Sequence, residues 1–171
     1  MTRDGSVSGY RGLILSSPAP ILSQKALIEQ FHSAVFLASL PGASATPFRL
    51  PAAQGEREFL APPLVELSLL PGDALAEEQF CVIFTKDLAL VMVLGTNAAG
   101  APAFQFSFDP GLVRQAWLQL RSRLHLAKED YLPNLEALVE QFAPPIPDYR
   151  LVSEFGRQLL KRLVRATGGG N

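Results

Sequence analysis

Residues 75–124 read LAEEQFCVIFTKDLALVMVLGTNAAGAPAFQFSFDPGLVRQAWLQLRSRL, and this stretch decides the fold of the chain. Residues 80–84 and 88–94 are apolar throughout, which is typical of inner strands that are covered on both faces. Residues 103–108 alternate phenylalanine with small or polar residues, which predicts a third strand with one buried face. Because the connections between these segments are short, we expect the three strands to pair antiparallel as a meander.

A long amphipathic helix is predicted to follow the meander. Asp109 and Pro110 form an N-cap and first-turn pair. Behind them, apolar residues recur at spacings of four, three and four, at Val113, Trp117, Leu120 and Leu124. This stripe predicts that the helix packs on the sheet, which places Trp117 in the core and not on a ligand.

Toward the N-terminus, two further strands are predicted at residues 34–40 and 64–69, joined by a long proline-rich connection. A short helix is expected over residues 24–32, with Ser23 as its N-cap. Residues 1–21 are rich in Ser, Gly and Pro, so we expect them to be flexible.

Two helices are predicted after the central stretch. One begins near Asp130, and the other spans residues 148–166. The last helix carries apolar residues at spacings of three, four and four, at Val152, Phe155, Leu159 and Leu163. Such a stripe is similar to a short coiled-coil seam, and we expect it to form the dimer or partner surface.

Composition indicates a folded domain, because 48% of the 171 residues are hydrophobic and 18% are charged. The longest apolar run, 88–94, is far shorter than the roughly 18 residues of a membrane-spanning helix. The N-terminus has no basic start followed by an apolar segment, since Asp4 and Gly5 interrupt it. We therefore expect a cytoplasmic protein without membrane insertion.

Charge is distributed unevenly along the chain. The formal net charge is −1, whereas residues 144–171 carry five basic and two acidic residues. A nucleic-acid-binding domain usually has a stronger basic bias with interleaved aromatic residues. We therefore expect no nucleic-acid partner.

Cys81 is the chemically reactive candidate of the central stretch. As the single cysteine, it excludes an internal disulfide and a zinc site built on several thiolates. Its place in an apolar strand favours a small buried hydrophobic residue, and the alternative is a redox-sensing thiol.

The other reactive side chains form no catalytic constellation. His32 and His125 each end a predicted helix, without other metal ligands at suitable spacing. The paired glutamates at positions 56 and 58 and at 77 and 78 are interpreted as surface charge. We therefore expect neither catalytic residues nor a metal site.

The central stretch resembles the DICT sensory domain. The similarity lies in the acidic and aromatic residues that enter the strand within residues 75–84, and in the step Phe106-Ser107-Phe108-Asp109 into a helix that carries Val113. Residues 22–165 as a whole are similar to the N-terminal sensory region of cyanobacterial and plastid sensor histidine kinases, often described as GAF-like.

This resemblance implies a signal-input module and not an enzyme, acting as a homodimer or on a signalling partner. Its last helix stands where the linker to the phosphotransfer helices would begin. The sequence reaches Asn171 without a phosphoacceptor helix pair or an ATP-binding domain, so we expect no autokinase activity in it. Some related regions hold a cofactor through a cysteine nearer the N-terminus, but none precedes Cys81, so the cofactor stays unknown.

We predict an α/β fold of the α+β, GAF- or PAS-like kind: a mostly antiparallel sheet of about five strands, flanking helices and a C-terminal signalling-type helix. Residues 1–21 are assigned to a flexible segment, 22–146 to the sensory domain, and 147–171 to the last helix and a glycine-rich tail. The predicted core comprises Val35, Leu37, Phe80, Val82, Phe84, Leu90, Met92, Phe104, Phe106 and Trp117.

Two other functions remain open. The first is a stand-alone adaptor that uses the same helices to bind a protein without sensing a ligand. The second is an enzyme with a diffuse site, which would require a pocket that joins His32 or His125 to carboxylates.

Overall fold

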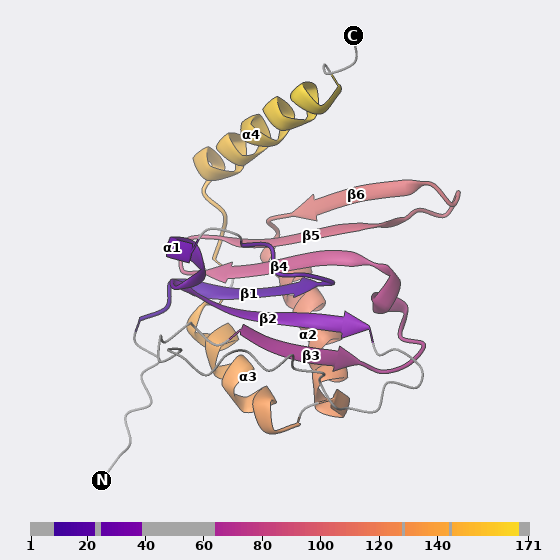
Figure 1. Cartoon of the computed structure of the whole chain (residues 1–171). Helices are drawn as coiled ribbons and strands as arrows, with labels where there is room; N and C mark the ends of the chain where they lie inside the picture. The colour runs from indigo at the N-terminus through magenta and orange to yellow at the C-terminus, as the bar shows by residue number, and fades with distance from the viewer. Residues whose placement is uncertain (1–8, 23–24, 39–63, 128, 144, 168–171) are drawn as a thin grey trace, which may run out of the picture.

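Six strands form one mixed sheet in the order β3-β2-β1-β4-β5-β6 (Figure 1). This computed structural model describes residues 9–22, 25–38, 64–127, 129–143 and 145–167. The strands are β1 (Gly12–Ser17), β2 (Phe31–Ala38), β3 (Leu64–Leu69), β4 (Gln79–Thr85), β5 (Ala89–Thr96) and β6 (Pro102–Ser107). The pairings β1–β2 and β2–β3 are parallel, whereas β1–β4, β4–β5 and β5–β6 are antiparallel. The predicted meander is therefore confirmed, and the predicted five strands become six.

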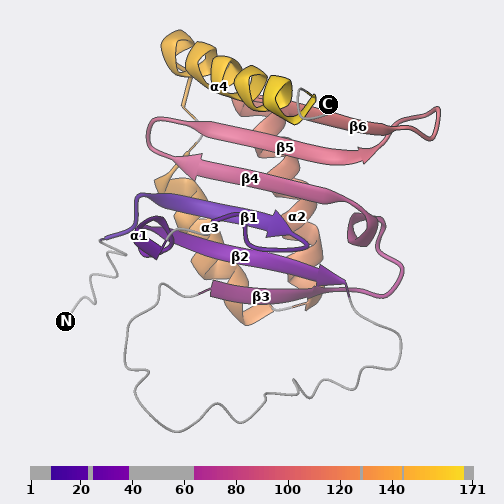
Figure 2. The same ribbon diagram turned by 45° about the horizontal axis from the view of Figure 1, so that its top comes forward.

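Helices cover the two faces of the sheet unequally. The helical elements are α1 (Lys25–Ile28), η1 (Ala74–Glu77), α2 (Pro110–Ala127), η2 (Glu129–Tyr131), α3 (Leu132–Gln141) and α4 (Tyr149–Thr167). Helices α2 and α3 pack against one face, which we call the inner face, and the short α1 lies on the opposite, outer face (Figure 1). Helix α4 lies at the β6 edge of the sheet (Figure 2).

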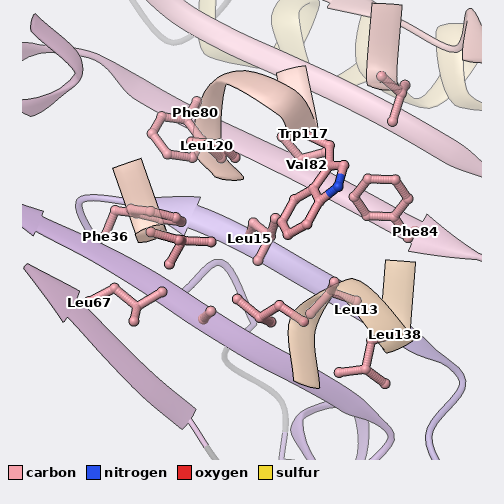
Figure 3. Packing of buried hydrophobic residues seen from close by; sticks show 14 of the residues in the cluster. Leu13, Leu15, Phe36, Leu67, Phe80, Val82, Phe84, Trp117, Leu120 and Leu138 are labelled. Carbon is pink, nitrogen blue, oxygen red and sulfur yellow. The ribbon is translucent and has the colours of Figure 1, made fainter. Parts of the chain in front are cut away.

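The hydrophobic core lies between the inner face and the two helices (Figure 3). The sheet contributes Leu13, Leu15, Ala34, Phe36, Leu67, Leu69, Phe80, Val82, Phe84 and Ala89, and the helices contribute Val113, Trp117, Leu120, Leu124, Leu135 and Leu138. Burial of each large apolar side chain stabilises the fold by roughly 1.5–3 kcal/mol. The predicted stripe of α2 is buried along its whole length, so its packing on the sheet is confirmed.

The start of α2 also follows the sequence prediction. An Asp109 side-chain oxygen accepts a hydrogen bond from the Leu112 amide at 2.9 Å, and Pro110 is the first helical residue. Proline suits this position because its missing N–H would have no partner inside the helix. The cap therefore fixes where β6 ends and α2 begins.

The prediction that residues 1–21 are flexible is wrong for Gly12–Ser17, which form the central strand β1. Leu15 pairs with Ala34 of β2 on one side and with Val82 of β4 on the other. A Cβ atom at Gly12 would clash with the Phe84 carbonyl oxygen, so only glycine fits at this position. The domain therefore includes residues before the predicted boundary at 22.

The elements after β1 differ in their boundaries from the prediction. The helix expected over 24–32 is a single turn, α1, and the next strand begins at Phe31, three residues earlier than expected. His32 therefore lies within β2 and does not end a helix. The polar residues His32 and Ser33 interrupt the apolar pattern, so periodicity alone placed the start of the strand too late.

The predicted burial of β6 is also wrong. Phe108 is buried, but Phe104 and Phe106 are 47% and 41% exposed. β6 is an edge strand, and alternation tells which side chains share a face but not whether another element covers it. Among the other predicted core residues, Leu37 and Met92 are half-buried, and the remaining six are buried.

An ion pair connects α2 to the segment between β3 and β4. The Asp73 carboxylate accepts the Leu75 amide at 3.0 Å, and Arg123 Nε donates to it at 2.8 Å. Burial acts to raise the pKa of Asp73, but the hydrogen bonds from Leu75 and Arg123 and the Arg123 charge outweigh it and hold the pKa below its usual value. The carboxylate is therefore charged at neutral pH and fixes η1 against α2.

Candidate functional site

Cys81 lies in the middle of β4 on the outer face of the sheet, between Ser16 of β1 and Met92 of β5 in the strand register. Its side chain is only 4% exposed, and burial raises the pKa of its thiol to about 12. The thiolate is the form that reacts with oxidants and electrophiles. The location therefore favours a packed thiol, and a redox role for Cys81 stays a prediction without support from its surroundings.

We expect Cys81 in the folded protein to react with a disulfide reagent such as DTNB at least about 100-fold more slowly than in guanidinium chloride. A pKa of about 12 lowers the thiolate fraction at pH 8 by about 1,000-fold relative to an ordinary thiol. Thionitrobenzoate release monitored at 412 nm in the two solvents measures the ratio. Equal rates would restore the redox hypothesis.

A pocket of about 350 Å³ adjoins Cys81, and we call it the outer pocket. Its walls come from residues 17–21 and from β4, β5 and β6. The lining residues are Ser17, Pro18, Ala19, Pro20, Ile21, Gln79, Phe80, Cys81, Met92, Val93, Leu94 and Phe104. None of these residues carries a charge, so the pocket is neutral and mostly apolar.

Four phenylalanines connect the outer pocket to α4, and we call them the phenylalanine cluster: Phe104, Phe106, Phe108 and Phe155. The Phe155 ring lies 5.4 Å from that of Phe106 and 5.2 Å from that of Phe108. Phe106 is in turn 5.9 Å from Phe104, which lines the pocket. These centroid distances are typical of favourable aromatic pairs, so the cluster holds α4 at the β6 edge.

The predicted seam of α4 is only partly available to a partner. Val152, Phe155 and Leu159 are half-buried, and Phe155 packs on the sheet of its own chain. The side chain of Leu163 lies outside the described residues. The sequence pattern therefore identified the apolar side of α4, whereas the structure assigns Phe155 to an internal contact.

Among the described side chains of α4, three exposed large apolar residues lie outside the predicted seam: Tyr149, Leu151 and Leu160. Tyr149 is 83% exposed and Leu160 is 64% exposed. With Gly156, Tyr149 and Leu160 follow spacings of seven and four, so they share one side of the helix. This helical spacing could have identified them, but the prediction followed the neighbouring stripe that begins at Val152.

The side of α4 that lies opposite the predicted seam is charged and exposed. It carries Arg150, Glu154, Arg157 and Lys161, and Arg157 donates a hydrogen bond to Glu154 at 2.6 Å. The hydrogen bond from Gln158, followed by the charge of Arg157, lowers the pKa of Glu154. Because this pair is solvated, its charge contributes to solubility more than to stability.

His32 is buried on the inner face against two tyrosines. Its Nε2 atom lies 2.8 Å from the Tyr131 hydroxyl oxygen, and its ring centroid is 5.7 Å from that of Tyr10. Burial lowers the pKa of His32 and raises the pKa of Tyr131 to about 12. A neutral imidazole paired with a neutral phenol fits a structural role in the core.

The remaining candidate groups add no reaction centre. The side chain of His125 and residues 39–63, which include both Glu56 and Glu58, lie outside the described residues. Within the described part of the chain, no three or more His, Cys, Asp or Glu side chains are placed to hold a metal ion. Nor does that part contain a helix that is long and apolar enough to cross a lipid bilayer.

Comparison with known proteins gives one curated relative with a significant match. The chain is 36% identical over 149 residues to the sensor histidine kinase Hik34 of Synechocystis sp. (strain ATCC 27184 / PCC 6803 / Kazusa). This match spans 87% of the chain but 32% of the kinase, so the chain corresponds to about a third of that relative's length. No family model and no solved structure matches the chain. The chain is therefore related to one part of a cyanobacterial sensor histidine kinase.

Proposed function

We propose that this chain is a non-catalytic sensory domain of a two-component-type signalling system, with its output through α4. The observation that carries the proposal is the position of α4: an amphipathic helix held at the sheet edge by Phe155, with Tyr149 and Leu160 exposed. Exposed apolar side chains on one side of a helix suit a second helix. The relation to part of a sensor histidine kinase supports the same function.

The mechanism requires two arrangements of α4 that differ in their contact with the phenylalanine cluster. A signal that binds one arrangement more tightly than the other shifts the population between them. Aromatic pairs contribute about 0.5–1.5 kcal/mol each beyond their buried area, so the two contacts of Phe155 fit a reversible attachment. Such an attachment is weak enough to be shifted by a ligand or a partner.

A DICT-type or GAF-like classification belongs to the same proposal. The antiparallel meander β4–β5–β6, followed by the capped helix α2, supports it. The parallel strands β1, β2 and β3 depart from the mostly antiparallel sheet expected for a GAF- or PAS-like domain. We also propose a cytoplasmic location and a homodimeric or partner-bound state, as parts of the same sensory function.

We expect Leu160→Glu to weaken self-association at least about tenfold, because a charge would replace an apolar side chain at the contact. Sedimentation equilibrium over a range of concentrations measures the dimer dissociation constant. Gln158→Glu adds the same charge on the polar side of α4 and should leave the constant unchanged.

Two results would contradict the proposed output helix. In the first, the wild-type chain stays monomeric, and Leu160→Glu does not alter its binding to a partner. The second is an equal effect of both glutamate substitutions. A stand-alone adaptor would show the same loss with Leu160→Glu, but its association would not respond to any small ligand.

A further inference from the structure

We propose that the outer pocket binds an uncharged, mainly apolar small molecule, and that Phe104 and Phe106 transmit its binding to Phe155 of α4. The binding step follows from the pocket itself. The transmission step rests on the proposed sensory function, because it assumes that α4 is the output. Together, the two steps name the chemical class of the signal that this domain would receive.

The size and lining of the pocket support a ligand site. Its volume of about 350 Å³ lies within the range of small-molecule sites, which is about 300–1,000 Å³. Ile21, Leu94 and Phe104 at its walls are each more than 40% exposed. An apolar ligand would remove these side chains from water, which is the driving force for its binding.

The chemistry of the lining selects a neutral ligand. Gln79 and Ser17 are uncharged polar residues, and Cys81 keeps its proton because its pKa is about 12. No described lining residue offers a cation or an anion to pair with a charged ligand. A charged group would therefore lose its hydration without compensation, whereas an uncharged ring system would not.

The route from the pocket to α4 is short. Phe104 lines the pocket, and its ring lies 5.9 Å from that of Phe106 at an interplanar angle of 32°. The ring centroid of Phe106 lies 5.4 Å from that of Phe155. Because Phe104 and Phe106 are both partly exposed, a ligand that reorders Phe104 changes the surface on which Phe155 packs.

The binding step is tested with N-phenyl-1-naphthylamine, a neutral fluorescent probe. We expect saturable binding, and Leu94→Glu should weaken it at least tenfold by placing a charge in the wall of the pocket. The control is Leu64→Glu, because Leu64 is an equally exposed leucine on the outer face of β3, outside the pocket. This variant should bind the probe like the wild type.

A matched probe tests the neutrality of the site. The compound 8-anilino-1-naphthalenesulfonate has the same rings with an added sulfonate, and we expect it to displace the neutral probe at least tenfold less effectively. Equal displacement by the sulfonate would overturn the assignment of a neutral ligand. Equal loss of binding in Leu94→Glu and Leu64→Glu, or in neither, would overturn the pocket as the site.

The transmission step is tested by hydrogen exchange of residues 149–167 with and without saturating N-phenyl-1-naphthylamine. We expect the probe to change exchange in α4 of the wild type. Phe106→Leu leaves the lining residues of the pocket in place, so it should still bind the probe but lose this response. Unchanged α4 exchange in the wild type with the probe bound would refute the transmission. The association experiment with Leu160→Glu does not depend on the probe. It therefore tests α4 as the output helix separately from the transmission step.

Discussion

Replacing Leu15 with aspartate is expected to unfold the protein. Leu15 is fully buried in β1, with β2 and β4 paired on its two sides and α2 and α3 over its face. Loss of the leucine side chain alone costs about 2–5 kcal/mol, and a buried carboxylate without a partner costs several more. The sum is comparable to the whole stability of a domain, about 5–15 kcal/mol. Far-UV circular dichroism and size-exclusion chromatography measure the loss of fold.

The matched control for this substitution is Ile21→Asp. Ile21 belongs to the same N-terminal part of the chain, but its side chain is exposed, so we expect a change within about 1 kcal/mol. If Leu15→Asp were folded and melted like the wild type, β1 would not be a central strand. Residues 1–21 would then be flexible, as their composition predicts.

Trp117→Ala is expected to lower the free energy of unfolding by about 3–5 kcal/mol, the usual cost of removing a large buried aromatic side chain. Its indole lies close to Leu15, Val82 and Phe84 of the sheet (Figure 3). The cavity left behind would lack the contacts that these side chains make with the ring. Urea unfolding followed by circular dichroism measures the change, because the chain has a single tryptophan and the variant loses its fluorescence.

The control for Trp117→Ala is the next residue of the same helix. Leu118 is exposed, so Leu118→Ala should cost less than about 1 kcal/mol. A similarly small cost for Trp117→Ala would mean that the indole does not stabilise the core. In that case Trp117 would become a candidate for stacking on a ligand.

Individual residues of the candidate site were predictable from the sequence, but the way in which they come together was not. Cys81 and the apolar side of α4 were identified from the pattern of a strand and of a helix. The outer pocket was not identified, because its walls come from four separate parts of the chain. The internal role of Phe155 was missed for the same reason, since its partners lie elsewhere in the sequence: Phe106 in β6, and Phe108 between β6 and α2.

The sequence by itself determined the elements whose signals are local. Strands β4 and β5 follow from continuous apolar runs, α2 from the cap at Asp109 and its helical stripe, and α4 from its own apolar spacing. Only the tertiary structure decided that Gly12–Ser17 form the central strand and that Phe104 and Phe106 stay exposed. The physical reason is that capping and periodicity act within a few residues, whereas strand pairing and burial depend on distant segments that come together only in the folded chain.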